Sequence, residues 1–498
     1  MTSLITQISK LAATHNAPDP KLIRKHNIKL GLRNTDGSGV VVGLTSKGCV
    51  VGYEKVLKSA PLLNRQDITL QIPGLNRKLA PSEACYYLLN GQTPESSRSL
   101  EVFLSRLGYL SEYDVKPTKG RLYYCGYAIQ DLINAYKDSE EEGFDEATYL
   151  LLTGELPEAS QLKNFRNEMI RRRNIPMRVT RFITYDSENP DQMSALHRAV
   201  AALSLMDKYP NSDQIPHQIE QCLNLIAKFP TIIAHNYNAM MFRKGRGHGL
   251  INPSTNMSPM ENFVYMLNGQ KPDRFIAKLL DMLMILHAEH GGGNNSTFTV
   301  RSVTSSGANT YMAISSGIAS LSGYLHGGAN EAVLDMMANI QKNVKDWNDD
   351  EEIIVYLKKI LNGKAHDGKG KIYGIGHAVY TLSDPRAVIL LEKAEELAKM
   401  SNRENIFSLY QNVARLACKL ILKEKSKSVS PNVDFYSGFV YQMMGIPKEL
   451  FTPLFAMARI SGWCAHRLEQ IAQGRIMRPA YISSIEPRKY VSITKRCR

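Results

Sequence analysis

The feature that most constrains the fold is the helical spacing of apolar residues over almost the whole chain after about residue 75. In residues 274–288 the apolar side chains recur every three or four positions, which is typical of an amphipathic helix: Phe275, Ile276, Leu279, Leu280, Leu283 and Leu286. Further helices are predicted over residues 144–153, 312–325, 351–361, 385–400 and 405–423. Strands do not alternate with these helices, so a doubly wound parallel sheet is excluded and a mostly α fold is expected.

The N-terminal part of the chain has a different pattern. Residues 36–53, DGSGVVVGLTSKGCVVGY, contain two Val-rich runs around a Ser-Lys-Gly turn and predict a small β-hairpin. Residues 1–30 predict one or two helices that form an extension. The 498 residues exceed the size at which a single hydrophobic core stops growing, so two or more structural units are expected.

The charge and cysteine content restrict the partners and the compartment. The formal net charge of +14 fits an anionic partner, which could be nucleic acid, a membrane surface or a small multiply charged anion. No run of Lys and Arg is interleaved with aromatic residues, and no apolar stretch is long enough to span a bilayer, so nucleic acid and membrane are disfavoured. The seven cysteines are scattered without CxxC spacing, and no targeting segment is recognisable. We expect a cytoplasmic protein.

Two motifs suggest other chemistry only weakly. Residues 363–370, GKAHDGKG, match a phosphate-binding loop except at Gly370, which replaces the Ser or Thr that would hold magnesium. His287 and His290 lie three residues apart, but the HExxH and HxxEH spacings of zinc enzymes are absent. Neither a nucleoside triphosphate site nor a metal site is therefore favoured.

Three loops rich in Gly and Asn carry ionisable side chains. They contain LHGGANE around His326, GIGHAVY around His377, and NVDFYSG around Asp434. Two His and one Asp on separate loops could assemble an acid–base site, because Gly lets a ligand approach the backbone closely. Taken singly, each of these residues could instead cap a helix or form an ordinary surface hydrogen bond.

At these positions the sequence resembles the citrate synthase family. The resemblance is carried by HAEHGGGNNST, LHGGANEAVL, GIGHAVYTLSDPRA and NVDFYSG in this order, and by FAMARISGWCAH and MRPAY near the C-terminus. It begins at about residue 30. It implies a mostly helical fold with an active-site cleft between a large domain, residues 31–326 and 439–498, and an inserted small domain, residues 327–438.

The resemblance also implies a reaction, the condensation of acetyl-CoA with oxaloacetate to citrate and CoA without a metal or another cofactor. By motif position Asp434 is the base that removes a methyl proton from the thioester. His326 hydrogen-bonds the enolate oxygen that forms, and His377 serves the ketone oxygen of oxaloacetate.

The same resemblance implies the binding residues. His290, Arg386 and Arg459 match positions that bind oxaloacetate, while Asn294 and Asn432 match supporting polar positions. Arg478 matches an arginine that reaches into the neighbouring subunit's site, which implies at least a homodimer. Oxaloacetate and CoA are anions, so the basic C-terminal residues 457–498 favour small anions over nucleic acid.

The sequence departs from the family pattern at several positions. Cys125 stands where many members have Arg, and Gly291 stands where many have an acidic residue. Tyr380 and Thr381 stand where some relatives have a basic residue near the CoA phosphates. Two alternatives stay open: a 2-methylcitrate synthase that uses propionyl-CoA, since one methyl group is worth only about 1–3 kcal/mol in a pocket, and a non-catalytic binding or regulatory member.

Overall fold

The computed structural model describes most of the chain after residue 112. The described residues are 45–57, 70–71, 78–79, 113–185, 187, 191–480 and 489–495, with residues 27, 29, 32, 40, 42 and 43. The chain forms two units, Met1–Leu44 with Arg475–Arg498, and Thr45–Gly474. The second unit contains the elements that position the candidate site. The predicted N-terminal helices in residues 1–30 fall outside the described residues, apart from Asn27 and Lys29.

The described elements are strands followed by a long series of helices. The strands are β1 (Gly48–Leu57), β2 (Leu70–Gln71), β3 (Lys78–Leu79), β4 (Tyr113–Tyr124) and β5 (Tyr127–Ala128). The helices up to residue 321 are α5 (Ile129–Asn134), α6 (Phe144–Thr153), α7 (Ala159–Arg172), α8 (Met177–Tyr185), α9 (Gln192–Leu203), α10 (Ile215–Arg243), α11 (Pro259–Asn268), α12 (Arg274–His287), α13 (Asn295–Ser305) and α14 (Thr310–Leu321). The later helices are α15 (Ala329–Asn343), α16 (Asp350–Leu361), α17 (Pro385–Met400), α18 (Glu404–Lys425), α19 (Val433–Met443) and α20 (Phe451–Gln473).

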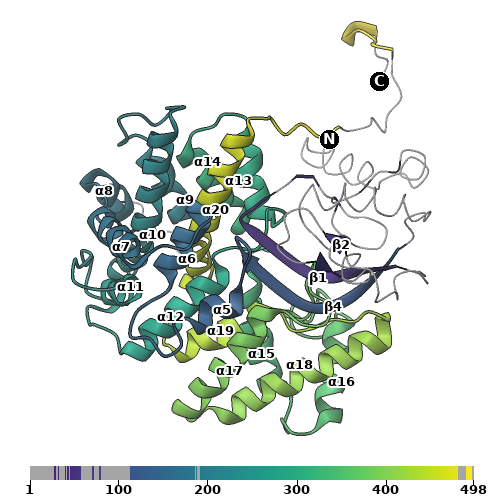
Figure 1. Cartoon of the computed structure of the whole chain (residues 1–498). Coiled ribbons are helices and arrows are strands. Elements are labelled where there is room, and N and C mark those ends of the chain that lie inside the picture. Colours follow the sequence, from purple (N-terminus) through teal and green to yellow (C-terminus); the bar gives the residue numbers. More distant parts are fainter. Residues whose placement is uncertain are drawn as a thin grey trace. The chain divides into compact units, whose positions relative to one another are not determined.

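Helix α20 is the centre of the helical packing. Every residue from Phe451 to Arg467 is buried, so the helix has no solvent-facing stripe. It packs against α6, α9, α10, α12, α13, α14 and α15, and Figure 1 shows it among these helices. A helix that is buried on all sides forms the core of a large unit, and it holds its side chains in fixed positions.

Several predicted helices are confirmed with their ends. Helix α6 spans the predicted residues 144–153 and stops at Gly154, whose φ of 90° is a left-handed conformation suited to Gly. Helix α17 begins at Pro385, because Asp384 caps it and Pro fits the first helical position. Helix α14 ends at Leu321, four residues before the predicted end.

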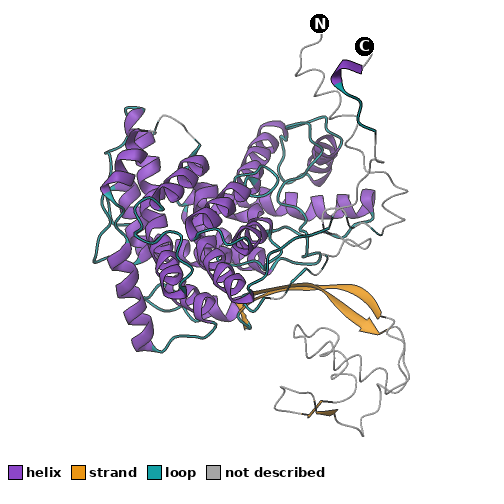
Figure 2. Ribbon diagram, turned by 90° about the horizontal axis from the view of Figure 1, so that it is seen from above, coloured by secondary structure: helices purple, strands orange, loops and turns teal. Residues whose placement is uncertain are grey.

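The small sheet near the N-terminus is confirmed, but its pairing differs from the predicted hairpin. Strand β1 pairs with β4 in an antiparallel register that matches Gly48 with Tyr124 and Leu57 with Tyr113. Val40 and Val42, in the first predicted Val-rich run, belong to no strand. Figure 2 shows β1 and β4 as a long twisted ribbon. Strand β4 also contradicts the prediction that the chain is helical almost everywhere after residue 75.

Helices α15 to α19 pack mainly with one another. Helix α17 contacts α18 and α19, α15 contacts α19, and α16 contacts α18. These helices come from the segment that the sequence assigns to a small inserted domain, residues 327–438, and that division stays a prediction. Loop 363–370 follows helix α16 and not a strand, which differs from a phosphate-binding loop.

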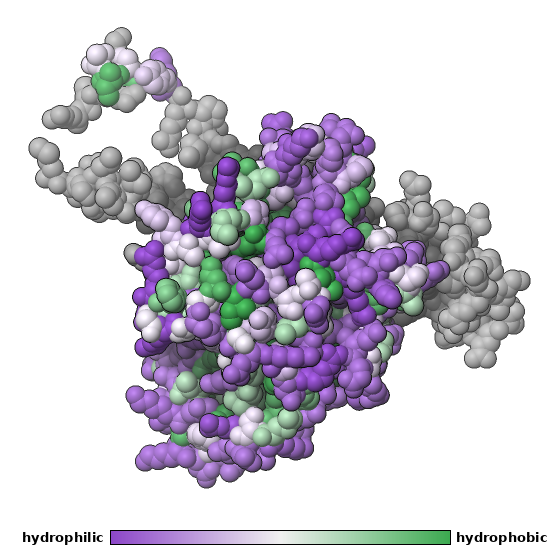
Figure 3. All heavy atoms as spheres, turned by 90° about the vertical axis from the view of Figure 1, so that its left-hand side faces the viewer, coloured by the Kyte–Doolittle hydropathy of each residue, from purple (hydrophilic) through white to green (hydrophobic). Residues whose placement is uncertain are grey.

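Figure 3 shows the face on the side of α7, α8, α10 and α11, where hydrophilic residues cover most of the surface between small apolar patches. Among the helices that the structure describes, none has both the length and the apolar character needed to cross a membrane. The described cysteines Cys125, Cys222, Cys418 and Cys464 are free thiols.

Asp281 of α12 provides a test of how the helices are joined. Its carboxylate is buried and accepts hydrogen bonds from the backbone N–H groups of Gly143 (2.7 Å) and Phe144 (3.0 Å), at the start of α6. We expect Asp281→Ala to destabilise the protein by about 1–3 kcal/mol, because it leaves buried donors without an acceptor. Thermal unfolding measures this. Asp273→Ala, which removes the exposed cap of the same helix, should cost less; an equal or smaller cost for Asp281→Ala would contradict the prediction.

Candidate active site

Asn432 joins the loop around His377 to the start of helix α19. Its side-chain amide donates to the carbonyl of Gly376 (2.8 Å), and its side-chain oxygen accepts from the backbone N–H of Asp434 (3.0 Å). The backbone N–H of Asn432 also donates to the carbonyl of Gly374 (2.9 Å). One side chain therefore sets the distance between the loop that carries His377 and the helix turn that carries Asp434.

An ion pair between Asp384 and Arg386 lies beside this junction. The Asp384 carboxylate accepts from Nε (3.0 Å) and Nη2 (2.8 Å) of Arg386, and both side chains are almost completely buried. The same carboxylate accepts from the backbone N–H of Val433 (3.2 Å). Asp384 thus connects the first turn of α17 with the first turn of α19. Burial raises the pKa of Asp384, but the charge of Arg386 outweighs it and holds that pKa below its ordinary value.

The hydrogen bonds of His377 select one tautomer of its ring. Its Nδ1 accepts from the backbone N–H groups of Val379 (3.0 Å) and Tyr380 (3.1 Å). The neutral ring therefore carries its proton on Nε2, which lies 3.1 Å from Nε2 of His290. The two imidazoles stack with their centroids 4.9 Å apart, and the Tyr380 ring stacks on His377 at 4.8 Å. His377 thus presents a fixed N–H donor.

His326 is held from the other side by helix α13. Its Nε2 accepts from the backbone N–H of Ser296 (3.2 Å), which places the ring proton on Nδ1. The Ser296 hydroxyl donates to the Asn294 side-chain oxygen (2.9 Å) and accepts from Trp463 (3.2 Å). Burial and the charge of Arg459 lower the pKa of His326 to about 4, so the ring is neutral at pH 7.

The guanidinium of Arg459 in α20 has a partner for only one of its three nitrogens among the described residues. Its Nε donates to the carbonyl of His287 (2.6 Å), and its guanidinium lies 4.8 Å from the Phe455 ring centroid. Among the described residues, neither Nη1 nor Nη2 finds a hydrogen-bond acceptor, although the side chain is completely buried. Burial lowers the pKa of Arg459 to about 10, which still leaves it charged at pH 7. Two unpartnered N–H groups of a guanidinium match the two oxygens of a carboxylate.

Asp434 is the carboxylate with the most strongly perturbed proton affinity in this group. It is half-buried in the first turn of α19. Burial raises its pKa to about 6, with Asp384 acting in the same direction and Arg386 and Arg459 in the opposite one. A carboxylate with this pKa is a better proton acceptor than an ordinary Asp and still ionised at pH 7.

The structure brings together most of the site residues that the sequence predicts. His290 and His377 are in contact, and the charges of Arg386 and Arg459 reach His290 and Asp434. Asn294 and Asn432 support the neighbouring helix starts. Arg478 lies in the other unit of the chain, so its predicted role is not tested.

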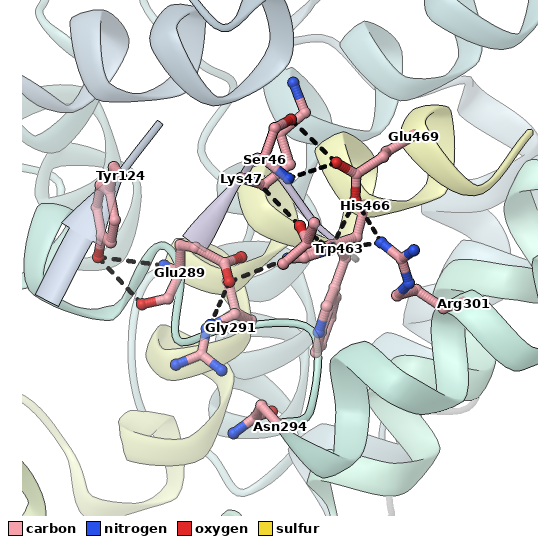
Figure 4. Close-up of polar contacts among 12 residues, drawn as sticks. Ser46, Lys47, Tyr124, Glu289, Gly291, Asn294, Arg301, Trp463, His466 and Glu469 are labelled. Carbon is pink, nitrogen blue, oxygen red and sulfur yellow. Dashed lines mark hydrogen bonds and ion pairs between the residues drawn. The ribbon is translucent and has the colours of Figure 1, made fainter. Parts of the chain in front are cut away.

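Sequence reasoning missed the supporting residues. His287 is completely buried with both ring nitrogens unpartnered among the described residues, and Arg386 and Arg459 act on it after burial to lower its pKa. Its spacing from His290 could have shown that both side chains face one site. Glu289 and His466 form a buried pair (3.0 Å) behind the same loop, drawn in Figure 4. No local pattern signals that pair, because 177 residues separate its members.

The comparisons with known proteins agree with this geometry. The family described as citrate synthase, C-terminal domain, matches residues 99–480. A citrate synthase of Acidithiobacillus ferridurans is 37% identical over 388 residues, covering 76% of this chain and 93% of that protein. A 2-methylcitrate synthase of Corynebacterium glutamicum is 33% identical over 403 residues, covering 78% and 97%. The Thermoplasma acidophilum citrate synthase, solved as a ternary complex with carboxymethyl coenzyme A and oxaloacetate, has a TM-score of 0.64 at 27% identity, covering 76% of this chain and 93% of that chain.

Nη1 and Nη2 of Arg459, which have no acceptor among the described residues, predict a binding site for a dicarboxylate. We expect oxaloacetate to bind the free protein, and Arg459→Gln to weaken that binding at least tenfold, because a charge-assisted pair contributes about 1.5–3 kcal/mol. Isothermal titration calorimetry measures both. Arg467→Gln is the matched control, since Arg467 is buried in the same helix but donates to Thr304 and Thr310. Equal losses in both variants would argue against a direct role for Arg459.

Proposed function

Because this chain belongs to the citrate synthase family, we propose that Asp434, His326 and His377 carry out its reaction, the condensation of acetyl-CoA with oxaloacetate. The enzyme is an acyltransferase: the methyl carbon of acetyl-CoA attacks the ketone carbon of oxaloacetate, and hydrolysis of the thioester releases citrate and CoA. The observation that carries the assignment is the arrangement of one carboxylate, two oriented neutral imidazoles and two buried arginines around the same loops.

Asp434 is the base in this proposal. A thioester methyl proton is too weakly acidic for a free carboxylate, so the enolate oxygen must be stabilised as the proton leaves. Burial raises the pKa of Asp434 to about 6, which brings the base closer to the working pH than an ordinary Asp. His326 supplies the stabilising donor through Nδ1, because its Nε2 is occupied by the Ser296 N–H.

His377 acts on the second substrate. Two backbone N–H groups hold its Nδ1, so the ring proton lies on Nε2. In this structure Nε2 contacts Nε2 of His290, and in the proposal its N–H turns to the ketone oxygen of oxaloacetate when the substrate is bound. As the carbon–carbon bond forms, this oxygen gains negative charge and takes up the proton. His290, whose Nε2 lies 3.1 Å from that of His377, orients the substrate beside it.

The two arginines bind the carboxylates of oxaloacetate. Arg459 offers Nη1 and Nη2, and Arg386 keeps its orientation through the pair with Asp384. Asp384 pairs directly with Arg386, whereas Nη1 and Nη2 of Arg459 have no acceptor among the described residues and are left for the substrate. A dianion therefore suits the site better than a neutral keto compound.

We assign closure of the site to the segment 327–438. His377 and Asp434 lie within this segment, whereas His326 directly precedes it and Arg459 follows it. Movement of the segment would therefore change the distances of His377 and Asp434 from His326 and Arg459. Closure excludes water and aligns the thioester with the ketone. In enolisation and condensation Asp434 accepts the methyl proton and imidazole N–H groups serve the two oxygens, and water supplies the hydroxyl group and proton of the hydrolysis, so the proposal includes no metal or other cofactor.

A homodimer that works in the cytoplasm completes the proposal. Arg478 would then contribute to the neighbouring subunit's site, as the family resemblance implies. Large apolar side chains beside the site support an interface: Tyr324 and Leu325, next to His326, are 77% and 73% exposed. The free thiols of Cys125, Cys222, Cys418 and Cys464 support a reducing compartment.

The main alternative within the family is 2-methylcitrate synthase. Its substrate, propionyl-CoA, differs by one methyl group, and the comparisons include a relative with that name. More of the relatives named above are citrate synthases, which favours acetyl-CoA. A non-catalytic member is disfavoured, because the proposed base and both donors are present and oriented.

Release of free thiol from acetyl-CoA in the presence of oxaloacetate tests the function. We expect the wild-type enzyme to release thiol faster from acetyl-CoA than from propionyl-CoA, and Asp434→Asn to lower kcat by about 10²–10⁴-fold, the usual contribution of a general base. Asp335→Asn, which changes an exposed carboxylate paired with Lys448, is the control. Full activity of Asp434→Asn would exclude Asp434 as the base.

The pKa of Asp434 also predicts a pH dependence. The protonated acid cannot accept the methyl proton, so kcat/KM for acetyl-CoA should be constant well above pH 6 and fall tenfold per pH unit below it. His326 stays neutral in this range, because its pKa is about 4. Rates measured between pH 5 and pH 9 check this. A kcat/KM that stays constant down to pH 5 would show that the pKa of Asp434 in the free enzyme is not raised to about 6.

A further inference from the structure

A buried polar network extends from the oxaloacetate-binding loop to the start of strand β1. Glu289 contacts His466 (3.0 Å), and His466 contacts Arg301 (3.0 Å). Arg301 pairs with Glu469 (2.5 Å), whose carboxylate also accepts from the backbone N–H of Ser46 (2.7 Å). Figure 4 shows these side chains in one group between helix α20 and the loop after α12. None of the catalytic steps above uses them.

The side chain of Glu289 fits into its site only because two neighbouring residues, Gly48 and Gly462, have no side chain. Its side chain is completely buried. A Cβ added to Gly48 of β1 would lie 2.4 Å from Oε1, and a Cβ added to Gly462 of α20 would lie 2.4 Å from Oε2. The carboxylate is therefore enclosed between a strand and a helix, and any side chain at either glycine would displace it.

The hydrogen bonds of His466 direct its proton toward Glu289. Arg301 has no acceptor function, so Nη1 of Arg301 must donate to Nδ1 of His466. The ring proton then sits on Nε2 and is donated to Oε1 of Glu289. Arg301 thus fixes the tautomer of His466, and His466 fixes the orientation of the Glu289 carboxylate.

Glu289 in turn holds the backbone turn next to His290. Its Oε1 accepts from the backbone N–H of Gly291, whose φ of 80° requires a left-handed conformation. The backbone of Glu289 is held from the opposite side by the Tyr124 hydroxyl, which bonds its N–H and carbonyl at 3.2 Å. His290 lies between these two fixed points, so its ring position depends on the Glu289 carboxylate.

Glu289 also acts on Arg459. Burial raises the pKa of Glu289, but the interaction with His466, including its hydrogen bond, and the charge of Arg459 outweigh burial and hold that pKa below its ordinary value, so the group is an anion. Glu289 is the opposite charge that most strongly counteracts the effect of burial on the pKa of Arg459. The negative charge of Glu289 therefore offsets the positive charge of Arg459. Nη1 and Nη2 of Arg459, which have no acceptor among the described residues, can bind the substrate.

We propose that Glu289 and His466 are positioning residues for oxaloacetate, which orient His290 and sustain the charge of Arg459 without touching the substrate. This inference rests on the proposed function. It predicts that damage to the pair weakens oxaloacetate binding and leaves acetyl-CoA binding almost unchanged, because the effect passes only through His290 and Arg459.

Substitutions of His466 separate positioning from general stability. Gln places its amide donor near the position of Nε2, whereas Asn places it near that of Nδ1. We therefore expect His466→Asn to raise the Kd for oxaloacetate at least tenfold and His466→Gln to restore most of the affinity. A tenfold change equals about 1.4 kcal/mol, within the range for a hydrogen bond to a charged group. The KM for acetyl-CoA should change less than threefold.

The control is a buried histidine away from the site. His235 of α10 contacts only the carbonyl of Ile251 among the contacts that the structure describes (2.9 Å), so His235→Asn should lower the melting temperature without changing the Kd for oxaloacetate. Glu289→Gln, which keeps the shape and removes the charge, should weaken binding as His466→Asn does. Unchanged oxaloacetate affinity in folded His466→Asn and Glu289→Gln, or equal losses in His235→Asn, would overturn the inference.

The same measurements distinguish this inference from the proposed function. Calorimetry with oxaloacetate alone needs no turnover, and thiol release by the wild-type enzyme is measured in parallel. A wild-type protein that neither binds oxaloacetate nor releases thiol contradicts the proposed function. A wild-type protein that does both, with His466 and Glu289 variants of equal affinity, contradicts the positioning role alone.

Discussion

The buried ion pair between Asp384 and Arg386 is the interaction on which the site depends. Asp384 is at once the cap of α17, the partner of Arg386 and the acceptor for the Val433 N–H. Removing either charge would leave the other buried and uncompensated, which is far more costly than losing an exposed pair. The pair therefore couples the position of a substrate-binding arginine to the helix turn that carries Asp434.

Around this pair, the surroundings of each ionisable side chain set whether it is charged or neutral at pH 7. Asp384 and Glu289 compensate the two arginines from behind, and burial together with the arginines keeps His290 and His326 neutral by lowering their pKa values. Asp434 is the carboxylate of this group whose pKa stays raised, because burial outweighs the opposing charges of Arg386 and Arg459. One group of residues can thus offer cationic binding groups, neutral donors and a base at the same pH.

The sequence predicts local features of this fold better than its long-range pairings. Helices α6 and α17 were predictable with their ends, because Gly154 and the Asp384–Pro385 pair are local signals. Strand β4 was not, since it contains Pro117 and Gly120 and finds its partner β1 about 65 residues away. The resemblance identified the residues around His326, His377 and Asp434, but not the contacts that orient them, such as Ser296 to His326.

Helix α20 explains how distant segments reach one site with little freedom. Arg459, Trp463 and His466 are spaced by four and three residues, so they lie on one face of the helix. Each holds a different partner: the carbonyl of His287, the hydroxyl of Ser296, and the carboxylate of Glu289. His287 and Glu289 precede His290 in the loop after α12. Ser296 lies in the first turn of α13, where its backbone N–H orients His326. Because residues Phe451–Arg467 of α20 are buried, this part of the helix fixes the positions of its three side chains and of their partners in both loops, as a mobile surface element could not.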